Sequence, residues 1–202
     1  MASGPGCADP VGMRPALLVL ALVGALLLPG TAFARGGDYV FDGGSAAHQR
    51  QVRAALEASR FDWNVVPAEI TIHVRRGVPT HATRGHIWLD ANLVESGTFA
   101  WAPIQDEYAH QIHFFRFGDA IEAQLTEQLG ARDWCYGVSG LRHGEYGCER
   151  FTSTLVWSFW PSRDNVYRPR SSGDESAAMA PARFRALVAG LLGIPNPFAV
   201  TR

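Results

Sequence analysis

The chain has 202 residues, with 18 Lys and Arg against 19 Asp and Glu, so its net charge is −1. This balance leaves no basic stripe that would suit nucleic acid and no polybasic patch that would suit an anionic membrane surface. We therefore do not expect nucleic acid as a partner. The length indicates one domain rather than several.

The N-terminus has the pattern of a secretory signal peptide. Residues 16–28 form an uncharged apolar run after Arg14, and an Ala-x-Ala cleavage site follows at residues 32–34. The alternative is a membrane anchor, but the run is shorter than the roughly 20 apolar residues that a spanning helix needs. We therefore expect residues 1–34 to be removed, and the mature protein to be secreted and extracellular with no stable membrane anchor.

The mature chain, residues 35–202, is expected to form a single domain that begins near Arg35. Met13 would open a more ordinary signal peptide than Met1, so two translation starts stay open. The stretch 161–181 is rich in Arg, Ser, Pro and Asp. It is expected to be a surface loop of this domain, because too little chain follows it to fold alone.

Two cysteines, Cys135 and Cys148, lie in the mature chain. An even number in an exported protein favours a disulfide over two free thiols. Closing a loop this short would stabilise the fold by about 3 kcal/mol in the chain-entropy model. A metal site using both is the other alternative, although the spacing differs from a paired C-x-x-C knuckle.

Hydrophobic periodicity predicts a small α+β domain in which helices carry most of the core. Apolar residues alternate in residues 69–74, which indicates a half-buried strand, and a second short strand is expected at residues 86–90. Helices are expected at residues 45–60, 101–117, 120–129, 148–160 and 183–192. Residues 130–147 are expected to form a loop.

One predicted helix concentrates polar side chains on an otherwise apolar element, in the run Q-D-E-Y-A-H-Q-I-H from Gln105 to His113. Asp106, His110 and His113, at i, i+4 and i+7, share one helix face, with Glu107 at its edge. Buried charges are costly unless they are paired or bind a metal, so the pattern indicates a metal or catalytic site. The alternative is a solvated helix face, because D-E-x-x-H alone is a weak pattern.

The D-E-Y-A-H motif resembles the H-E-x-x-H helix of zincin metallopeptidases. Residues 85–90, G-H-I-W-L-D, resemble the zincin edge strand that pairs with an extended substrate. Residues 145–151, E-Y-G-C-E-R-F, resemble the third-ligand helix of the gluzincin branch. The chain also resembles small secreted actinobacterial-type zincin-like proteins. The resemblance covers about residues 45–160 and implies a zincin-like fold, with a few-stranded sheet packed by the motif helix and further helices.

The resemblance also implies a role for each motif residue. His110 matches the second metal ligand, Glu149 the third, and Glu107 the general base that takes a proton from the attacking water. Asp106 stands where the family has its first His ligand. An Asp binds zinc at about 2.0 to 2.2 Å, but a second carboxylate quenches the Lewis acidity of the ion and favours harder metals such as Mn²⁺. His113 is an alternative ligand beside His110, and it would move the ion along the helix, away from Glu107.

We therefore expect a secreted peptidase-type hydrolase that depends on zinc, or on another divalent metal, and acts on a peptide or protein substrate. The alternative, favoured by Asp106, is a zincin-fold pseudoenzyme that serves as an extracellular binding module. A third alternative is a purely structural exported domain. His143, Glu145 and Tyr146 are weaker candidates for a ligand or a transition-state donor.

Overall fold

The computed structural model describes Met1 and residues 37–199. The rest of the predicted signal peptide and its cleavage site at residues 32–34 lie outside the described residues. The helices and strands of the described residues belong to one of the two units into which the chain divides, Ala32–Arg202. No helix among the described residues is long and apolar enough to cross a membrane.

A four-stranded mixed sheet forms one layer of the domain. Its strands are β1 (Tyr39–Gly43), β2 (Ile70–Arg75), β3 (His81–Thr83) and β4 (His86–Asp90). The order in the sheet is β1-β2-β4-β3, with β1, β2 and β4 parallel and β3 antiparallel to β4. Alternate residues of the two central strands are buried, which gives the sheet one apolar face.

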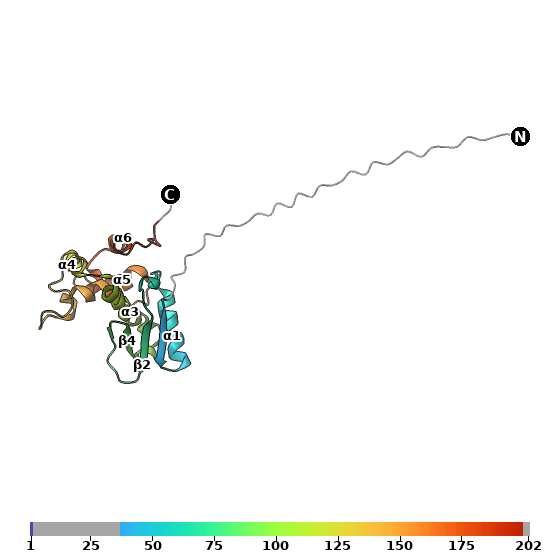
Figure 1. The fold of residues 1–202 in the computed structure, drawn as a ribbon, viewed down its shortest axis with the longest axis horizontal. Helices are drawn as coiled ribbons and strands as arrows, with labels where there is room; N and C mark the ends of the chain where they lie inside the picture. The colour runs from blue at the N-terminus through green and yellow to red at the C-terminus, as the bar shows by residue number, and fades with distance from the viewer. Residues whose placement is uncertain (2–36, 200–202) are drawn as a thin grey trace. The chain divides into compact units, whose positions relative to one another are not determined.

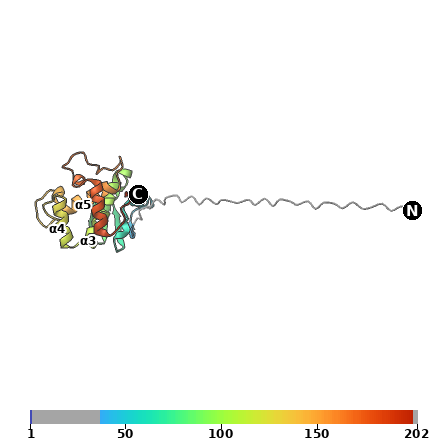
Figure 2. The same cartoon turned by 90° about the horizontal axis from the view of Figure 1, so that it is seen from above.

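Helices cover that apolar face. The α-helices of the described residues are α1 (Ala46–Ala58), α2 (Ala91–Val94), α3 (Trp101–Arg116), α4 (Asp119–Gln128), α5 (Gly147–Phe159) and α6 (Pro181–Leu192). Short 3-10 turns are η1 (Trp63–Val65), η2 (Gly97–Ala100), η3 (His143–Glu145) and η4 (Glu175–Ala177). Helix α3 contacts α1, the strands β3 and β4, and α5, so it lies between the sheet and α5 (Figure 1). Helices α4 and α6 in turn pack against α5 (Figure 2).

Local sequence explains where two of these helices begin and end. The Ser45 hydroxyl accepts a hydrogen bond from the backbone N–H of His48 and caps the start of α1. Pro181 lies in the first turn of α6, where a missing N–H costs nothing. Gly193 ends α6 with φ 67°, in the left-handed region that favours glycine.

The described residues confirm the mixed α+β class and add two strands that the periodicity did not indicate, β1 and β3. Residues 86–90 form a strand as predicted, but their assignment to the sheet edge was wrong. They are β4, which lies between β2 and β3, and β3 forms that edge instead. The reason is a tight turn at Gly85, with φ 82°, that folds the three-residue β3 back along β4.

The stretch 161–181 is irregular, as expected of a loop, but it is partly buried rather than wholly on the surface. Asn165 is buried and donates a 2.8 Å hydrogen bond from Nδ2 to the carbonyl of Trp160. Ser176 is also buried and donates to the carbonyl of Tyr167. These bonds, together with the packing of η4 on α5, hold this stretch beside the cleft described next.

Candidate metal centre

The polar face of α3 is buried at the base of a cleft. Asp106, His110 and His113 are only 5%, 8% and 4% exposed. The alternative of a solvated helix face is therefore wrong. Together with Glu107 and Glu149, these three residues line a cleft of about 760 Å³.

Two buried glutamines fix α3 relative to the rest of the domain. Gln105 donates a 2.7 Å hydrogen bond from Nε2 to the carbonyl of Ala55 at the end of α1. Gln111 accepts from the N–H of Gly85 at 2.8 Å and donates to the carbonyl of Thr83 at 2.9 Å. The motif helix is thus tied to α1 on one side and to the β3–β4 turn on the other.

Three ligand-type side chains meet where α3 packs against α5. The His110 Nε2 lies 4.0 Å from Asp106 Oδ2 and 3.4 Å from Glu149 Oε2. One ligand atom from each of the three residues lies within 4.8 Å of the other two. The structure therefore brings together Asp106, His110 and Glu149.

The donor set fits a divalent metal ion. The Oδ1 atom of Asp106 is buried and has no hydrogen-bond partner among the described residues. Such an orphaned carboxylate oxygen is costly unless something else satisfies it. Zinc binds both imidazole and carboxylate ligands. The two carboxylates of this set also suit manganese, which is a harder ion than zinc.

His113 lies on the other side of the His110 ring. Its Nε2 is 3.0 Å from His110 Nδ1, so it contacts the nitrogen that faces away from Glu149. In this position His113 fixes the orientation of the His110 ring. Another combination, His110 with His113 and the Cys148 sulfur, also brings three such atoms together, but that sulfur is in a disulfide.

Glu149 is held by partners on three sides. The Tyr136 hydroxyl donates to Oε1 at 2.9 Å, and His143 Nε2 lies 3.0 Å from Oε2, the oxygen that also faces His110. The other nitrogen of His143 contacts Glu175 at 3.0 Å. This network orients the Glu149 carboxylate toward α3.

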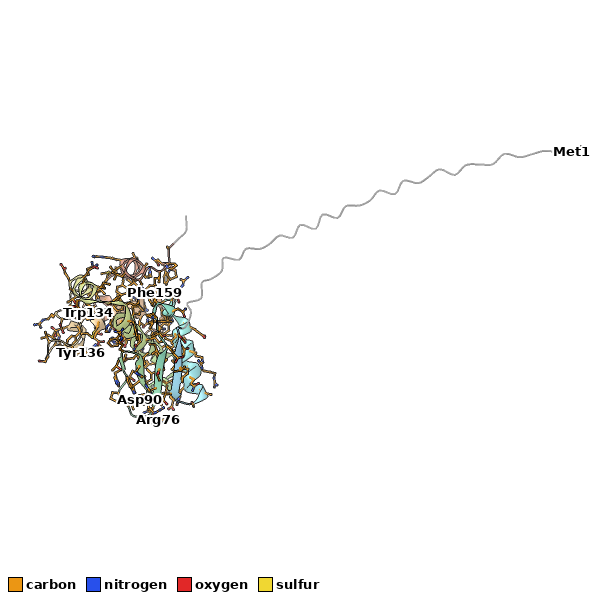
Figure 3. The ribbon with its side chains drawn as sticks, viewed as in Figure 1. Met1, Arg76, Asp90, Trp134, Tyr136 and Phe159 are labelled. Carbon is orange, nitrogen blue, oxygen red and sulfur yellow. A yellow bond between two sulfur atoms is a disulfide. The ribbon has the colours of Figure 1, made fainter. Side chains whose placement is uncertain are left out.

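A disulfide joins Cys135 to Cys148, with their Cα atoms 5.4 Å apart. Cys135 precedes Tyr136 and Cys148 precedes Glu149, so the bridge lies next to both ends of the Tyr136–Glu149 hydrogen bond. Tyr136 has φ 58°, the one positive φ of a non-glycine residue in the described part of the chain. In Figure 3, Tyr136 and Trp134 lie near each other and away from Asp90, the last residue of β4.

The start of α5 leaves no room for a larger residue beside this loop. A Cβ on Gly147 would lie 2.7 Å from the indole of Trp134. The backbone N–H groups of Gly147 and Cys148 each donate a 2.8 Å bond to the preceding loop, at Asp133 and Trp134. The close packing of loop and helix thus sets the place of Tyr136 relative to the site.

Comparisons with known proteins leave the site to be interpreted from its own chemistry. No protein family, curated protein or solved structure matches the chain. The zincin-like identity therefore stays a prediction.

Two acidic groups of the site, Asp106 and Glu107, hold protons for part or most of the population near neutral pH. Burial is the main cause that raises the pKa of Asp106 to about 7. Burial, with the neighbouring Asp106 carboxylate adding to it, raises the pKa of Glu107 to about 8. Carboxyl groups with pKa values in this range can exchange protons at physiological pH.

The histidines of the site are perturbed in opposite directions. Hydrogen bonds to Glu149 and Glu175 raise the pKa of His143 to about 10, so it carries a charge. Burial lowers the pKa of His113 to about 3, so it is neutral. Burial disfavours the charged form of His110, but its contacts with Glu149 and Asp106 outweigh burial and raise its pKa. Contacts with His110 and His143 likewise outweigh burial and hold the pKa of Glu149 well below its usual range.

Sequence reasoning missed part of this site. Tyr167, which lines the cleft, and Glu175, which contacts His143, come from the stretch 161–181, and Tyr136 comes from the loop 130–147, where only the neighbouring cysteines gave a signal. Of the weaker candidates, His143 lines the cleft. Glu145 is paired with Arg132 and Arg142, and the buried Tyr146 donates its hydroxyl proton to a loop carbonyl.

Proposed function

We propose that the mature protein is a secreted, metal-dependent hydrolase of the peptidase type, with Asp106, His110 and Glu149 as the ligands of a zinc or manganese ion. The observation that carries the proposal is the convergence of these three buried groups at a cleft, with one Asp106 oxygen left without a partner. The resemblance to gluzincins supports the same assignment.

The residues around the ligands suit hydrolysis of an amide. A divalent ion would supply Lewis acidity that polarises the scissile carbonyl and favours ionisation of water. Glu107 lines the cleft beside the ligands. Its ionised form, which is the minority at neutral pH for a pKa of about 8, would accept a proton from the attacking water and return it to the leaving amine. His143, charged, is engaged through Nε2 with Glu149 and through Nδ1 with Glu175, so its part in this proposal is to orient the Glu149 ligand rather than to donate to the substrate.

An extended peptide is the substrate that best suits this cleft. Thr80, His81 and Ala82, from the edge strand β3 and the residue before it, line the cleft opposite the α3 residues. Strand β3 pairs only with β4 among the described residues, so the hydrogen-bonding groups of its other edge are open to a substrate strand.

The test is hydrolysis of an unfolded protein by the purified mature chain, in chelator and after reloading with Zn²⁺ or Mn²⁺. We expect activity only with metal. Glu107→Gln should abolish activity and keep the metal, and Glu149→Gln should lose both. Glu122→Gln is the matched control, because Glu122 lines the same cleft but lies outside the ligand cluster. Equal activity in chelator would reject a metal-dependent reaction.

A catalytically inactive binding domain on the same scaffold is the second candidate. One observation favours it: His143 Nε2 lies closer to Glu149 Oε2 than His110 Nε2 does, 3.0 Å against 3.4 Å. A charged His143 satisfies that oxygen without a metal. This candidate predicts peptide binding that chelator does not weaken, and no hydrolysis with either metal.

A further inference from the structure

The exposed face of the sheet carries a row of aromatic side chains. Asp42, His73, Trp88 and His81 are in register across β1, β2, β4 and β3. His86 projects from the same face, two residues before Trp88 on β4. Asp42, His81 and His86 are exposed, so solvent reaches the row.

The rings of this row are stacked on one another. His73 and Trp88 have centroids 4.8 Å apart at an angle of 14°, and His81 and Trp88 are 4.7 Å apart at 3°. Stacked rings cover each other's faces and present their edges. This surface therefore offers ring nitrogens rather than a flat platform for a planar ligand.

Two of these nitrogens face each other. His73 Nε2 lies 3.1 Å from His86 Nδ1. Two ligands that each lie about 2.0 Å from one ion in tetrahedral geometry are separated by a similar distance. The spacing between these two imidazoles therefore matches that of two ligands of a single ion.

A carboxylate sets the tautomer of the first imidazole. Asp42 Oδ2 lies 2.7 Å from His73 Nδ1, and Arg75 holds the other oxygen of Asp42 at 2.7 Å. The Nδ1 proton of His73 therefore points at the carboxylate, and its Nε2 lone pair accepts the Nδ1 proton of His86, which a bound ion would displace. A carboxylate behind a histidine is the usual outer-shell arrangement of a metal ligand.

We propose that His73 and His86 form a second metal site, a two-histidine site on the open sheet face that takes a borderline transition metal, with water completing the coordination. Imidazole ligands suit Cu²⁺, Ni²⁺ and Zn²⁺, and the general order of affinities places Cu²⁺ first. The ligands come from β2 and β4, and no residue of the α3 cluster takes part. The proposal is thus independent of the function proposed above.

The test is titration of the purified chain with Cu²⁺ alone, followed by calorimetry and electron paramagnetic resonance. His73→Asn and His86→Asn should each lower the affinity for one equivalent of Cu²⁺ by about tenfold or more. Asp42→Asn should lower the affinity for the same equivalent by about tenfold. His81→Asn is the matched control, since His81 stacks on the same Trp88 but faces no second imidazole. It should leave the Cu²⁺ affinity unchanged. Unchanged binding in both His73→Asn and His86→Asn, or an equal loss in His81→Asn, would overturn the proposal.

A measurement on the unmodified chain guards against variants that fail to fold. Cu²⁺ is paramagnetic and broadens the nuclear magnetic resonance signals of the imidazoles that bind it. The ring proton signals of His73 and His86 should broaden together at less than one equivalent. If both stay sharp in excess Cu²⁺, the site does not exist.

Discussion

Asp106 is the residue that makes this ligand set differ from one of two histidines and a glutamate. Its carboxyl group is buried and has one oxygen without a partner, and burial raises its pKa to about 7. A metal ion that binds here must therefore displace a proton from Asp106 for much of the population at neutral pH. Two carboxylate ligands also leave the ion a weaker Lewis acid than two imidazoles would.

Asp106→His is expected to raise the affinity for Zn²⁺ by about tenfold or more and to increase hydrolysis of unfolded protein, because a neutral imidazole restores the Lewis acidity of the ion. The adjoining cleft offers space for the larger ring. Competition with a chromophoric chelator measures the affinity. In the same background, Glu107→Gln should keep the zinc and lose the hydrolysis. A chain whose affinity and activity do not change would show that Asp106 is already a competent ligand.

Metal binding is expected to weaken as the pH falls through 7. Asp106, with a pKa of about 7, and His110, with a raised pKa, both take up protons in that direction, and a ligand must be deprotonated to bind. The apparent affinity should fall by up to about tenfold per pH unit for each proton that the ion displaces. Calorimetry in buffers of different ionisation enthalpy counts these protons. An affinity that is constant between about pH 6 and 8 would contradict the assignment of these ligands.

At the scale of elements, the long helices and the strand β2 lie within two residues of their predicted bounds, because each has a clear apolar period. The strand β3 has only three residues, His81–Thr83, and no period can be read over so short a run. The strand β1 is stabilised by pairing with β2. This contact is non-local, because the helix α1 lies between the two strands in the sequence. Strand order in a sheet is likewise a property of contacts between distant segments.

The site likewise has residues that the sequence predicted and residues that it could not predict. The spacing on α3 indicated that Asp106, His110 and His113 share a face, and the resemblance added Glu149. Tyr167 and Glu175 could not be predicted, because their places depend on how an irregular stretch packs on α5.

The disulfide is expected to support the metal site as well as the fold. The double change Cys135→Ala with Cys148→Ala should lower the free energy of unfolding by about 3 kcal/mol. It should also weaken metal binding by about tenfold, because Tyr136 is no longer held beside Glu149. Tyr136→Phe separates the two effects. It should weaken metal binding but change the free energy of unfolding by less than about 1 kcal/mol, because Tyr136 is exposed. Urea unfolding and metal titration measure them. Full metal affinity in the folded chain without the disulfide would refute this role.

For the whole molecule, the metal-free fold is expected to lose stability as the pH rises from about 5 to 9. Asp106 and Glu107 have pKa values of about 7 and 8, above their ordinary values of 3.8 and 4.5. The native state therefore keeps protons that the unfolded state has already released, so their contribution falls as the pH rises through this range. The pKa of His143 is raised to about 10, so its contribution is full below its ordinary 6.5 and is lost toward 10.

Asp106, Glu107 and His143 act in the same direction. Glu149, with its lowered pKa, loses its stabilising effect only in acid, and His113, whose pKa is lowered to about 3, opposes the trend only below its ordinary value of 6.5. Urea unfolding in chelator across this range measures the trend, and added metal should reverse it above about pH 7. A metal-free chain that becomes more stable toward pH 9 would show that these carboxyl groups are not buried as described.

Anomalous diffraction from crystals of the mature chain grown with Zn²⁺ would locate a metal ion bound to α3. We expect a peak about 2 Å from a carboxylate oxygen of Asp106, from His110 Nε2 and from Glu149 Oε2. The same peak should be absent from crystals of Glu149→Gln. A peak bound by His110 and His113 without Glu149, or none near α3 while Glu149 keeps its place, would contradict this ligand assignment.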